Sequence, residues 1–251
     1  MAINKGRVAI VTGAGQGLGE GIAKRLAAEG ARVLAVDMNP NTLEKVVAEI
    51  NAAGGEAMAL VADVGLKAET ERIAQTAIDK WGTIDILVNN AGINRDAIFY
   101  KMTEQQWDDV LRVNLKGVFM LMQACYAPMR EQKYGRIINM SSSAMRGNVG
   151  QANYAAAKAA IIALTNTFAL ENAKHGITAN TICPGAIDTP MARAVPESVL
   201  QGWINAIPAG RIGTPEDIAE MVAFFAGEGA GFVNGQHIWV DGAFQTGMKA
   251  K

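Results

Sequence analysis

The sequence predicts an α/β fold: a single doubly wound domain over residues 1–251 with a mostly parallel seven-stranded sheet. Apolar, β-rich runs alternate with amphipathic helical segments almost to the end of the chain. These runs are apolar at consecutive positions, which is typical of parallel strands covered by helices on both faces. No linker, repeat or low-complexity tract interrupts the alternation, and 251 residues is an ordinary length for one such domain.

The alternation gives the elements in order. The expected strands are 7–12, 32–37, 56–63, 85–90, 136–140, 177–183 and 236–242. The expected helices are about 17–29, 43–53, a segment that ends near 81, 103–131, 151–174 and a last helix that follows Thr214. Thr103 with Gln106 three positions later is a capping-box pattern, and Pro215 directly after Thr214 is a standard helix opening.

Composition excludes several classes of protein. The chain carries 23 Lys and Arg against 24 Asp and Glu, so nothing favours a nucleic acid or an anionic membrane as partner. No run approaches the roughly 20 apolar residues of a membrane span, and the first residues do not resemble a signal peptide. Cys125 and Cys183 lie far apart among apolar neighbours, which predicts reduced, buried thiols in a cytoplasmic protein. His175 and His237 have no metal-ligand spacing, so we expect no metal.

The segment 184–213 departs from the alternation, because it contains four prolines and is expected to be irregular. It follows the carboxyl end of a strand, where open α/β sheets bind ligands. A loop of this length in a compact domain is usually functional, so we expect residues 186–213 to form a lid over the substrate. The expected apolar lining of the substrate site comprises Phe99, Met145, Val149, Met191, Ala194, Val195, Val199, Leu200, Trp203 and Ile207.

The stretch TGAGQGLG at 12–19 joins the first expected strand to the first helix. Glycines there permit a tight turn and let backbone N–H groups approach a pyrophosphate at the N-terminus of the helix. A glycine-rich turn alone is a weak signal, but strand, loop and helix occur here in the order that a dinucleotide site requires. The pattern therefore predicts a dinucleotide-binding site.

Asp37 ends the second expected strand, where a carboxylate can accept hydrogen bonds from both ribose hydroxyls of NAD. The same carboxylate would repel the 2′-phosphate of NADP, and the residues that follow, MNPN, supply no Arg or Lys to offset the repulsion. The alternative is a strand-end Asp that only caps a turn. Asp37 predicts NAD as the cofactor, with NADP less favoured.

Tyr154 and Lys158 stand out in the alanine-rich stretch QANYAAAKAA, which begins at Gln151. Four positions apart on a helix, their side chains lie on one face, one turn from each other. One interpretation is a chance pair on a solvated face. The other is that the ammonium favours the phenolate and lowers the tyrosine pKa from about 10 toward neutrality, where a general acid/base works best.

Five short motifs occur in a fixed order: TGxxxGxG at 12–19, NNAG at 89–92, serines at 141–143, YxxxK at 154–158 and PG at 184–185. Together they resemble the short-chain dehydrogenase/reductase family across essentially the whole chain. The local sequences NAGINRDAIFYKMT and GQANYAAAKAA are most similar to the branch of β-ketoacyl-carrier-protein reductases and acetoacetyl-CoA reductases. The resemblance implies a Rossmann fold and a nicotinamide-dependent oxidoreductase.

The resemblance also implies roles for individual residues. Tyr154 is the expected general acid/base, Lys158 lowers its pKa and holds the nicotinamide ribose, and Asn114 anchors a water that links Lys158 to solvent. Asp63 and Val64 match the pair that contacts adenine. The other residues expected to bind the cofactor are Gly13, Gln16, Gly17, Leu18, Gly19, Asp37, Met38, Asn90, Ala91, Gly92, Pro184, Gly185, Ile187 and Thr189, of which the last four match the segment around the nicotinamide.

The serine that would bind the substrate oxygen is either Ser141 or Ser142. The spacing to Tyr154 that is common in the family favours Ser141, whereas the position after the strand RIINM favours Ser142. We give the strand more weight, because a one-residue deletion in a loop costs little whereas a register slip turns every side chain of a strand over. Ser142 is therefore the expected catalytic serine.

The apolar lid favours an aliphatic or alicyclic secondary alcohol or its ketone, or a 3-hydroxyacyl thioester, as substrate. The alternative is an NADPH-dependent 3-oxoacyl-(acyl-carrier-protein) reductase of fatty-acid synthesis, against which Asp37 argues, as does His175 at a position where such reductases often have an arginine. A nucleotide sensor without catalysis is a third candidate, but such relatives usually lack the tyrosine or the lysine. The family's usual state implies a homotetramer with interfaces on 103–131, 151–174 and 233–251.

Overall fold

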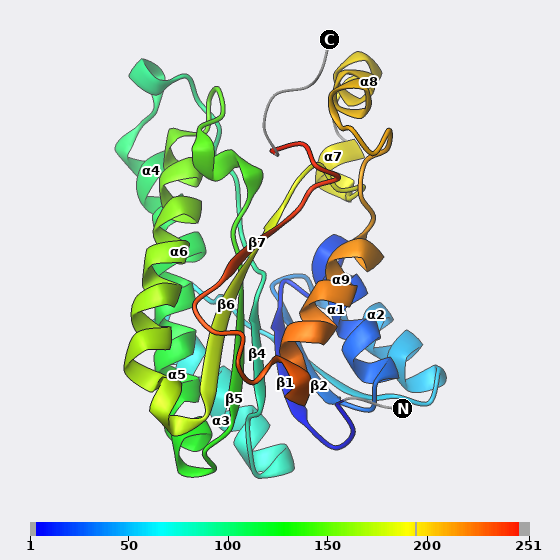
Figure 1. Cartoon of the computed structure of the whole chain (residues 1–251), viewed down its shortest axis with the longest axis vertical. Helices are drawn as coiled ribbons and strands as arrows, with labels where there is room; N and C mark the ends of the chain where they lie inside the picture. Colours follow the sequence, from blue (N-terminus) through cyan, green and yellow to red (C-terminus); the bar gives the residue numbers. More distant parts are fainter. Residues whose placement is uncertain (1–3, 194, 246–251) are drawn as a thin grey trace.

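The computed structural model describes residues 4–193 and 195–245. Ala194, the side chain of Met191 and residues 246–251 of an expected interface lie outside the described residues. Within them, seven strands form one sheet in the order β3-β2-β1-β4-β5-β6-β7 (Figure 1). Every strand pairing in this sheet is parallel, so the predicted doubly wound α/β fold is confirmed.

The observed elements follow the expected ones closely. The strands are β1 (Val8–Thr12), β2 (Arg32–Asp37), β3 (Glu56–Val61), β4 (Ile86–Asn89), β5 (Gly135–Met140), β6 (Ile177–Pro184) and β7 (His237–Val240). The α-helices are α1 (Gly17–Ala28), α2 (Pro40–Ala52), α3 (Lys67–Trp81), α4 (Glu104–Leu111), α5 (Gly117–Glu131), α6 (Ala152–Asn172), α7 (Pro190–Arg193), α8 (Glu197–Ala206) and α9 (Pro215–Ala226). Short 3₁₀ turns are η1 (Phe99–Lys101), η3 (Ser143–Arg146), η4 (Ala173–His175) and η5 (Glu228–Ala230), and η2 (Arg112–Lys116) is a π-helix.

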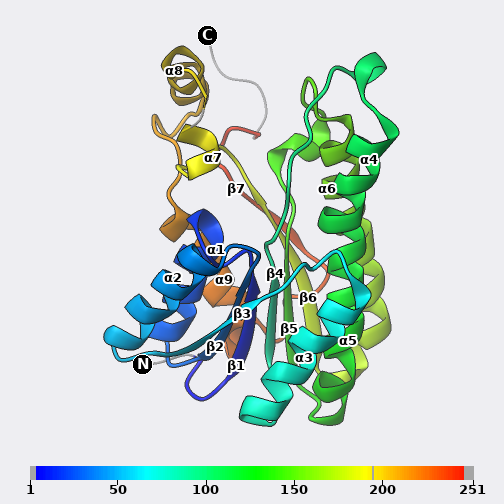
Figure 2. The same ribbon diagram turned by 180° about the vertical axis from the view of Figure 1, so that it is seen from behind.

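Helices cover both faces of the sheet, as the continuously apolar strands require. Along β1, Val8 and Ile10 join the core on one face, whereas Ala9 and Val11 join the core on the other. Helices α1, α2 and α9 cover the second face, and α3, α5 and α6 cover the first (Figures 1 and 2). Burying an aliphatic side chain of this kind contributes about 1.5–3 kcal/mol, so the two cores hold the strand ends in fixed positions.

The order of the strands places a crevice beside β1. This strand pairs with β2 on one side and with β4 on the other, so the order of the strands along the sheet reverses at β1. The loops that follow β1 and β4 therefore diverge at the carboxyl ends of these strands. The Thr12 hydroxyl oxygen accepts hydrogen bonds from the backbone N–H groups of Asn90 and Ala91 at 3.0 and 3.1 Å. These bonds hold the loop after β4 against the end of β1.

The helix expected at 103–131 has a different hydrogen-bond pattern in its middle. The backbone N–H of Gly117 donates to the carbonyl of Arg112, five residues back, so the α-helical pattern widens to a π turn between α4 and α5. The predicted capping box of Thr103 and Gln106 is present at the start of α4. The π turn is a local feature that the apolar periodicity did not reveal.

The segment 184–213 is more regular than expected, since it contains α7 and α8. Pro190 is the first residue of α7 and Pro196 is the N-cap of α8. Proline is tolerated at helix starts, because the first N–H groups of a helix have no intrahelical partner. The prolines therefore open these helices instead of preventing them. Of the helices in the described residues, none is long and apolar enough to cross a membrane.

Candidate active site

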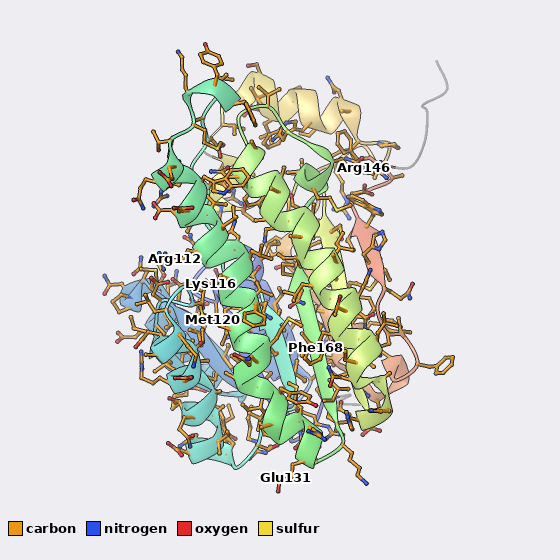
Figure 3. All side chains as sticks on the ribbon, turned by 90° about the vertical axis from the view of Figure 1, so that its left-hand side faces the viewer. Arg112, Lys116, Met120, Glu131, Arg146 and Phe168 are labelled. Atoms are coloured by element: carbon orange, nitrogen blue, oxygen red, sulfur yellow. The ribbon has the colours of Figure 1, made fainter. Side chains whose placement is uncertain are left out.

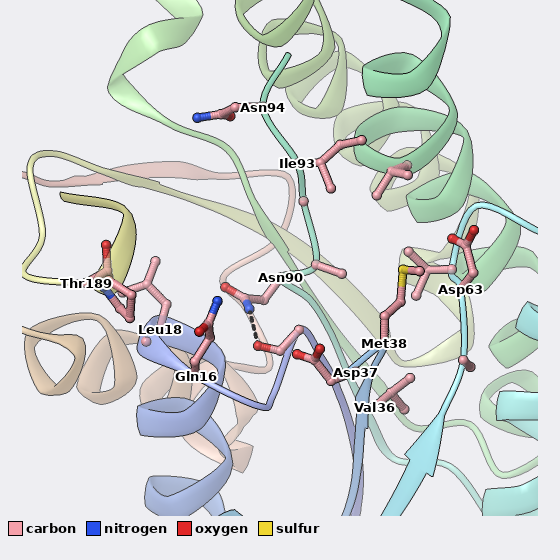
Figure 4. Close-up of a pocket in the computed structure, with 18 of the residues that line it drawn as sticks. Gln16, Leu18, Val36, Asp37, Met38, Asp63, Asn90, Ile93, Asn94 and Thr189 are labelled. Carbon is pink, nitrogen blue, oxygen red and sulfur yellow. Dashed lines mark hydrogen bonds between the residues drawn. The ribbon is translucent and has the colours of Figure 1, made fainter. Parts of the chain in front are cut away.

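A cavity of about 350 Å³ opens at the carboxyl ends of β1, β2 and β4 (Figure 4). Asp37, Met38 and Asp63 lie toward one side of it, and Gln16, Leu18 and Thr189 toward the other. Most of the residues expected to bind the cofactor line this cavity: Gly13, Gln16, Gly17, Leu18, Asp37, Met38, Asp63, Val64, Asn90, Ala91, Gly92, Tyr154, Lys158 and Thr189. The sequence motifs thus converge on one site.

The glycine-rich turn forms one wall. Gly13 and Gly17 have φ of +65° and +56°, a left-handed conformation that other residues adopt at a cost. A Cβ at Gly19 would lie 2.0 Å from the carbonyl oxygen of Gly13, so Gly19 lets α1 approach the turn instead of lining the cavity. This turn has the shape that a pyrophosphate needs at the start of α1, and the residues present fit a bound dinucleotide.

Asp37 lies where β2 meets the glycine-rich turn. One carboxylate oxygen accepts a hydrogen bond from the Gly15 N–H at 2.9 Å, and the other accepts one from the Asn39 N–H at 3.0 Å. These bonds fix the orientation of a half-buried carboxylate at the cavity wall. Of the described residues that line the cavity, Lys158 alone is cationic, and it lies beside Tyr154 instead of Asp37.

Asn90 and Asn114 fix the backbone of the loop after β4. The Asn90 amide donates to the Thr12 carbonyl at 2.9 Å. Asn114, which is fully buried in the π turn, donates to the carbonyl of Ile93 at 3.0 Å and accepts from its N–H at 2.8 Å. The Asn114 side chain therefore holds the loop that forms one wall of the cavity.

Tyr154 and Lys158 lie near the start of α6 with the lysine Nζ 5.5 Å from the centre of the phenol ring. Lys158 is buried, and its Nζ donates to the Met140 carbonyl at 2.7 Å. Burial lowers the pKa of Lys158 from 10.5 to about 8. Burial also raises the pKa of Tyr154 above 10; the hydrogen bond with Ser142 acts in the opposite direction, and the charge of Asp96 adds to the rise.

The direction for Tyr154 differs from the expected lowering of its pKa by Lys158. The protein environment removes water from the phenol, which disfavours the charged phenolate. The ammonium that should offset this is bonded to a carbonyl and is itself easier to deprotonate than an ordinary lysine. In the protein alone, therefore, burial outweighs the attraction between the two groups.

The two candidate serines point to different partners. The Ser141 hydroxyl donates to the backbone carbonyl of Lys158 at 2.7 Å and is buried. The Ser142 hydroxyl lies close enough to the Tyr154 phenol to lower the pKa of the phenol, and it accepts a hydrogen bond from the Ala144 N–H at 3.1 Å. Ser142 is thus the serine on the side of the phenol, whereas Ser141 attaches α6 to the end of β5.

Some expected residues lie outside the lining, although all of them are described. They are Gly19, Asn114, Ser142, Pro184, Gly185 and Ile187. None of the described side chains expected to line the substrate site is among those that line this cavity, and two of them, Phe99 and Val149, are 79% and 86% exposed. Six lining residues were not predicted: Val36, Ala62, Ile93, Asn94, Val113 and Pro190. All of them except Asn94 directly follow or precede a predicted residue, and Asn94 lies two residues after the NNAG motif, so the borders of the motifs would have found them.

A cavity lined by a glycine-rich turn, an acidic strand end, a tyrosine and a lysine is the arrangement of an oxidoreductase site. Comparison with known proteins agrees. A family model described as enoyl-(acyl carrier protein) reductase matches residues 13–245. The chain belongs to the short-chain dehydrogenase/reductase family, and it is an enzyme that acts on CH–OH donors and uses a nicotinamide cofactor.

Individual relatives are similar over nearly their whole length. The short-chain reductase protein NovJ of Streptomyces niveus is 45% identical over 96% of this chain and 95% of its own. The 3-oxoacyl-(acyl-carrier-protein) reductase FabG of Thermotoga maritima is 40% identical over 95% of this chain and 97% of its own. The crystal structure of levodione reductase superimposes with a TM-score of 0.93 at 35% identity, covering 97% of this chain and 99% of that one.

Proposed function

We propose that the protein is an NAD-dependent enzyme that interconverts a secondary alcohol and its ketone by hydride transfer, with Tyr154 as general acid/base. The observation that supports this most directly is that Tyr154 and Lys158 line the same cavity as Asp37 and the glycine-rich turn. The substrate class is an aliphatic or alicyclic alcohol, or a 3-hydroxyacyl thioester. Levodione reductase and the 3-oxoacyl reductase are relatives whose names indicate these two kinds of substrate.

The proton chemistry follows from the side chains. In oxidation, the Tyr154 phenolate takes the proton of the substrate hydroxyl while the C–H bond breaks; in reduction, the phenol returns a proton to the ketone oxygen. Ser142 donates a hydrogen bond to the same oxygen and orients it toward Tyr154. When bound, the oxidised nicotinamide accepts the hydride and brings a positive charge into the cavity. Lys158 holds the ribose and favours the phenolate through its own charge.

The cofactor preference rests on Asp37. A 2′-phosphate placed against this anchored carboxylate would bring two negatively charged groups together. No cation among the described lining residues lies beside the Asp37 carboxylate to offset the repulsion. We expect NADH to bind at least about tenfold more tightly than NADPH, and Asp37→Ala to remove most of that difference. Titration of both cofactors by fluorescence, with Glu44→Ala on the exposed face of α2 as control, measures it.

A clear NADPH preference of the unaltered protein would contradict the proposal and favour the alternative, an NADPH-dependent 3-oxoacyl-(acyl-carrier-protein) reductase. One feature of the surface suits that alternative. Arg130 and Lys174 lie close enough to His175 to lower its pKa, together with burial, which acts more strongly. Such a cationic cluster could dock an acidic carrier protein, so rates with carrier-linked and CoA-linked substrates should be compared.

We also propose a homotetramer in the cytoplasm. A groove on the outer face of α4, α5 and α6 has apolar residues such as Leu115 and Phe119 together with Asp108, Arg112 and Lys116 (Figure 3). A surface with both signs of charge around apolar side chains suits contact with a second copy. Light scattering tests it, since a monomer would contradict the proposal. The free, buried thiols of Cys125 and Cys183 suit a reducing compartment.

A further inference from the structure

We infer that Arg112 is a positioning residue for the adenine half of the cofactor, because it fixes the carboxylate of Asp63 at the cavity wall. This inference rests on the proposed function and on the expectation, drawn from the family resemblance, that Asp63 contacts adenine. Neither the glycine-rich turn nor the tyrosine–lysine pair includes Arg112, and it does not line the cavity itself. Its effect would be exerted through Asp63.

Both oxygens of Asp63 are held by the protein. The Arg112 Nη1 donates to one at 2.8 Å, and the Gly65 N–H donates to the other at 2.8 Å. Two bonds from different elements prevent the carboxylate from rotating about its terminal torsion. Asp63 therefore presents its remaining acceptor positions to the cavity in one orientation, as recognition of an amino group requires.

The π turn brings Arg112 to this position. Arg112 begins the five-residue segment η2, in which Val113 lines the cavity and Asn114 holds the loop after β4. The guanidinium crosses from this segment to the loop that follows β3. A single ion pair thus joins the helix layer to the end of β3 at the edge of the nucleotide site.

The residue at position 65 supports the same interpretation. A Cβ at Gly65 would lie 2.0 Å from the Arg112 Nη1 and 2.8 Å from its Cζ. Gly65 does not have a positive φ, so the backbone conformation does not require a glycine there. The glycine instead leaves room for the guanidinium. Any larger residue there would displace the arginine from Asp63.

The ion pair between Arg112 and Asp63 also matters when a ligand covers the Asp63 carboxylate. The Asp63 side chain is 20% exposed, and a ring placed over it would remove most of its remaining water. A carboxylate that already has a guanidinium partner loses less favourable solvation in this step than an unpaired one. Arg112 therefore lowers the cost of seating adenine.

The experiment compares ligands with and without adenine. We would measure the Kd of NADH, of ADP-ribose and of reduced nicotinamide mononucleotide for the unaltered protein and for Arg112→Ala, Arg112→Lys and Gly65→Ala. The control is Lys67→Ala, which removes an exposed cation that is paired with Glu71 on α3 and does not line the cavity. Gly65→Ala is the second variant, because it keeps every charge and displaces the guanidinium, while its Cβ would also lie 3.1 Å from a carboxylate oxygen of Asp63.

The expected result is that Arg112→Ala and Gly65→Ala weaken NADH and ADP-ribose by about tenfold, while the mononucleotide and the Lys67→Ala control are unchanged. Arg112→Lys should recover part of the loss. Equal Kd values for NADH in Arg112→Ala, Gly65→Ala and the unaltered protein would overturn the inference. So would an equal loss for all three ligands, which indicates a general structural role. If the unaltered protein binds neither NADH nor ADP-ribose, the proposed function itself is wrong.

Discussion

The cofactor wall and helix α8 are built in opposite ways. On the cofactor wall, Asp37, Asp63, Asn90 and Asn114 each have side-chain hydrogen bonds that fix their orientation. In α8, all ten residues are described and none is buried, and its N-cap Pro196 makes no side-chain cap. One region is preorganised and the other is held by few contacts. The contrast suits a molecule that would hold its cofactor in one geometry while the segment around α8, the expected lid over the substrate, adapts.

The strongest test of this contrast is Tyr154→Phe, which removes one hydroxyl from the preorganised cavity. We expect kcat to fall by about 10²–10⁴-fold, because no other group would move the proton, while the Kd of NADH stays the same. Steady-state rates and a cofactor titration measure the two effects. Far-UV circular dichroism controls for folding. If most of the turnover survives, Tyr154 is not the acid/base.

Within the preorganised region, variants of Ser141 and Ser142 should separate an effect on stability from an effect on rate. Ser142→Ala should lower kcat/KM by about 10²-fold, because it removes the hydroxyl that contacts Tyr154. Ser141→Ala should lower the free energy of unfolding by about 1 kcal/mol through the lost bond to Lys158, with a smaller effect on rate. Rates and urea unfolding of both variants test this. The opposite ranking of rates would assign the catalytic role to Ser141.

The buried charge of Lys158 should lower the free energy of unfolding of the protein. Its pKa is lowered to about 8, so the unfolded chain, with a lysine of pKa 10.5, binds more protons than the folded protein between these values. The free energy of unfolding from this group therefore rises with pH from about 8 to about 10.5, and the full cost is present below pH 8. Lys158→Met should raise the free energy of unfolding at neutral pH by on the order of 2 kcal/mol while removing activity.

The check on Lys158→Met is urea unfolding of both proteins at about pH 6.5 and about pH 9.5. The stability advantage of the variant should shrink at the higher pH, because the wild-type lysine is then largely neutral in the folded state. An advantage that does not change between the two pH values would show that the cost does not come from the charge of Lys158.

The smallest effects belong to α8. Trp203 is only half-buried there, so Trp203→Ala should change the free energy of unfolding by less than about 1 kcal/mol. It should raise KM for a ketone by about three- to tenfold and leave the Kd of NADH unchanged, because the expected lid would lose apolar contact with the substrate and none with the cofactor. Trp81→Ala, at the end of α3, is the matched control. A change in NADH affinity caused by Trp203→Ala would contradict the separation of the two regions.

The fold was predictable because it depends on patterns that are local in sequence. The glycine-rich turn, Asp37 and the Tyr154–Lys158 pair were found because each has its chemistry within a few residues. The pKa of Tyr154 could not be predicted this way, since it depends on how much water the folded site removes. The choice between Ser141 and Ser142 depends on side-chain direction at the end of β5, and Arg112 acts on Asp63 from a distant part of the chain.

The amide of Asn114 takes the place of a backbone partner for Ile93. Its side chain supplies one donor and one acceptor to Ile93 in the loop after β4, as a peptide unit would. An aspartate at this position would keep the size but place an oxygen against the Ile93 carbonyl, where a hydrogen is required. A change of one atom would therefore remove one of the two bonds by which this side chain holds the loop at the cavity.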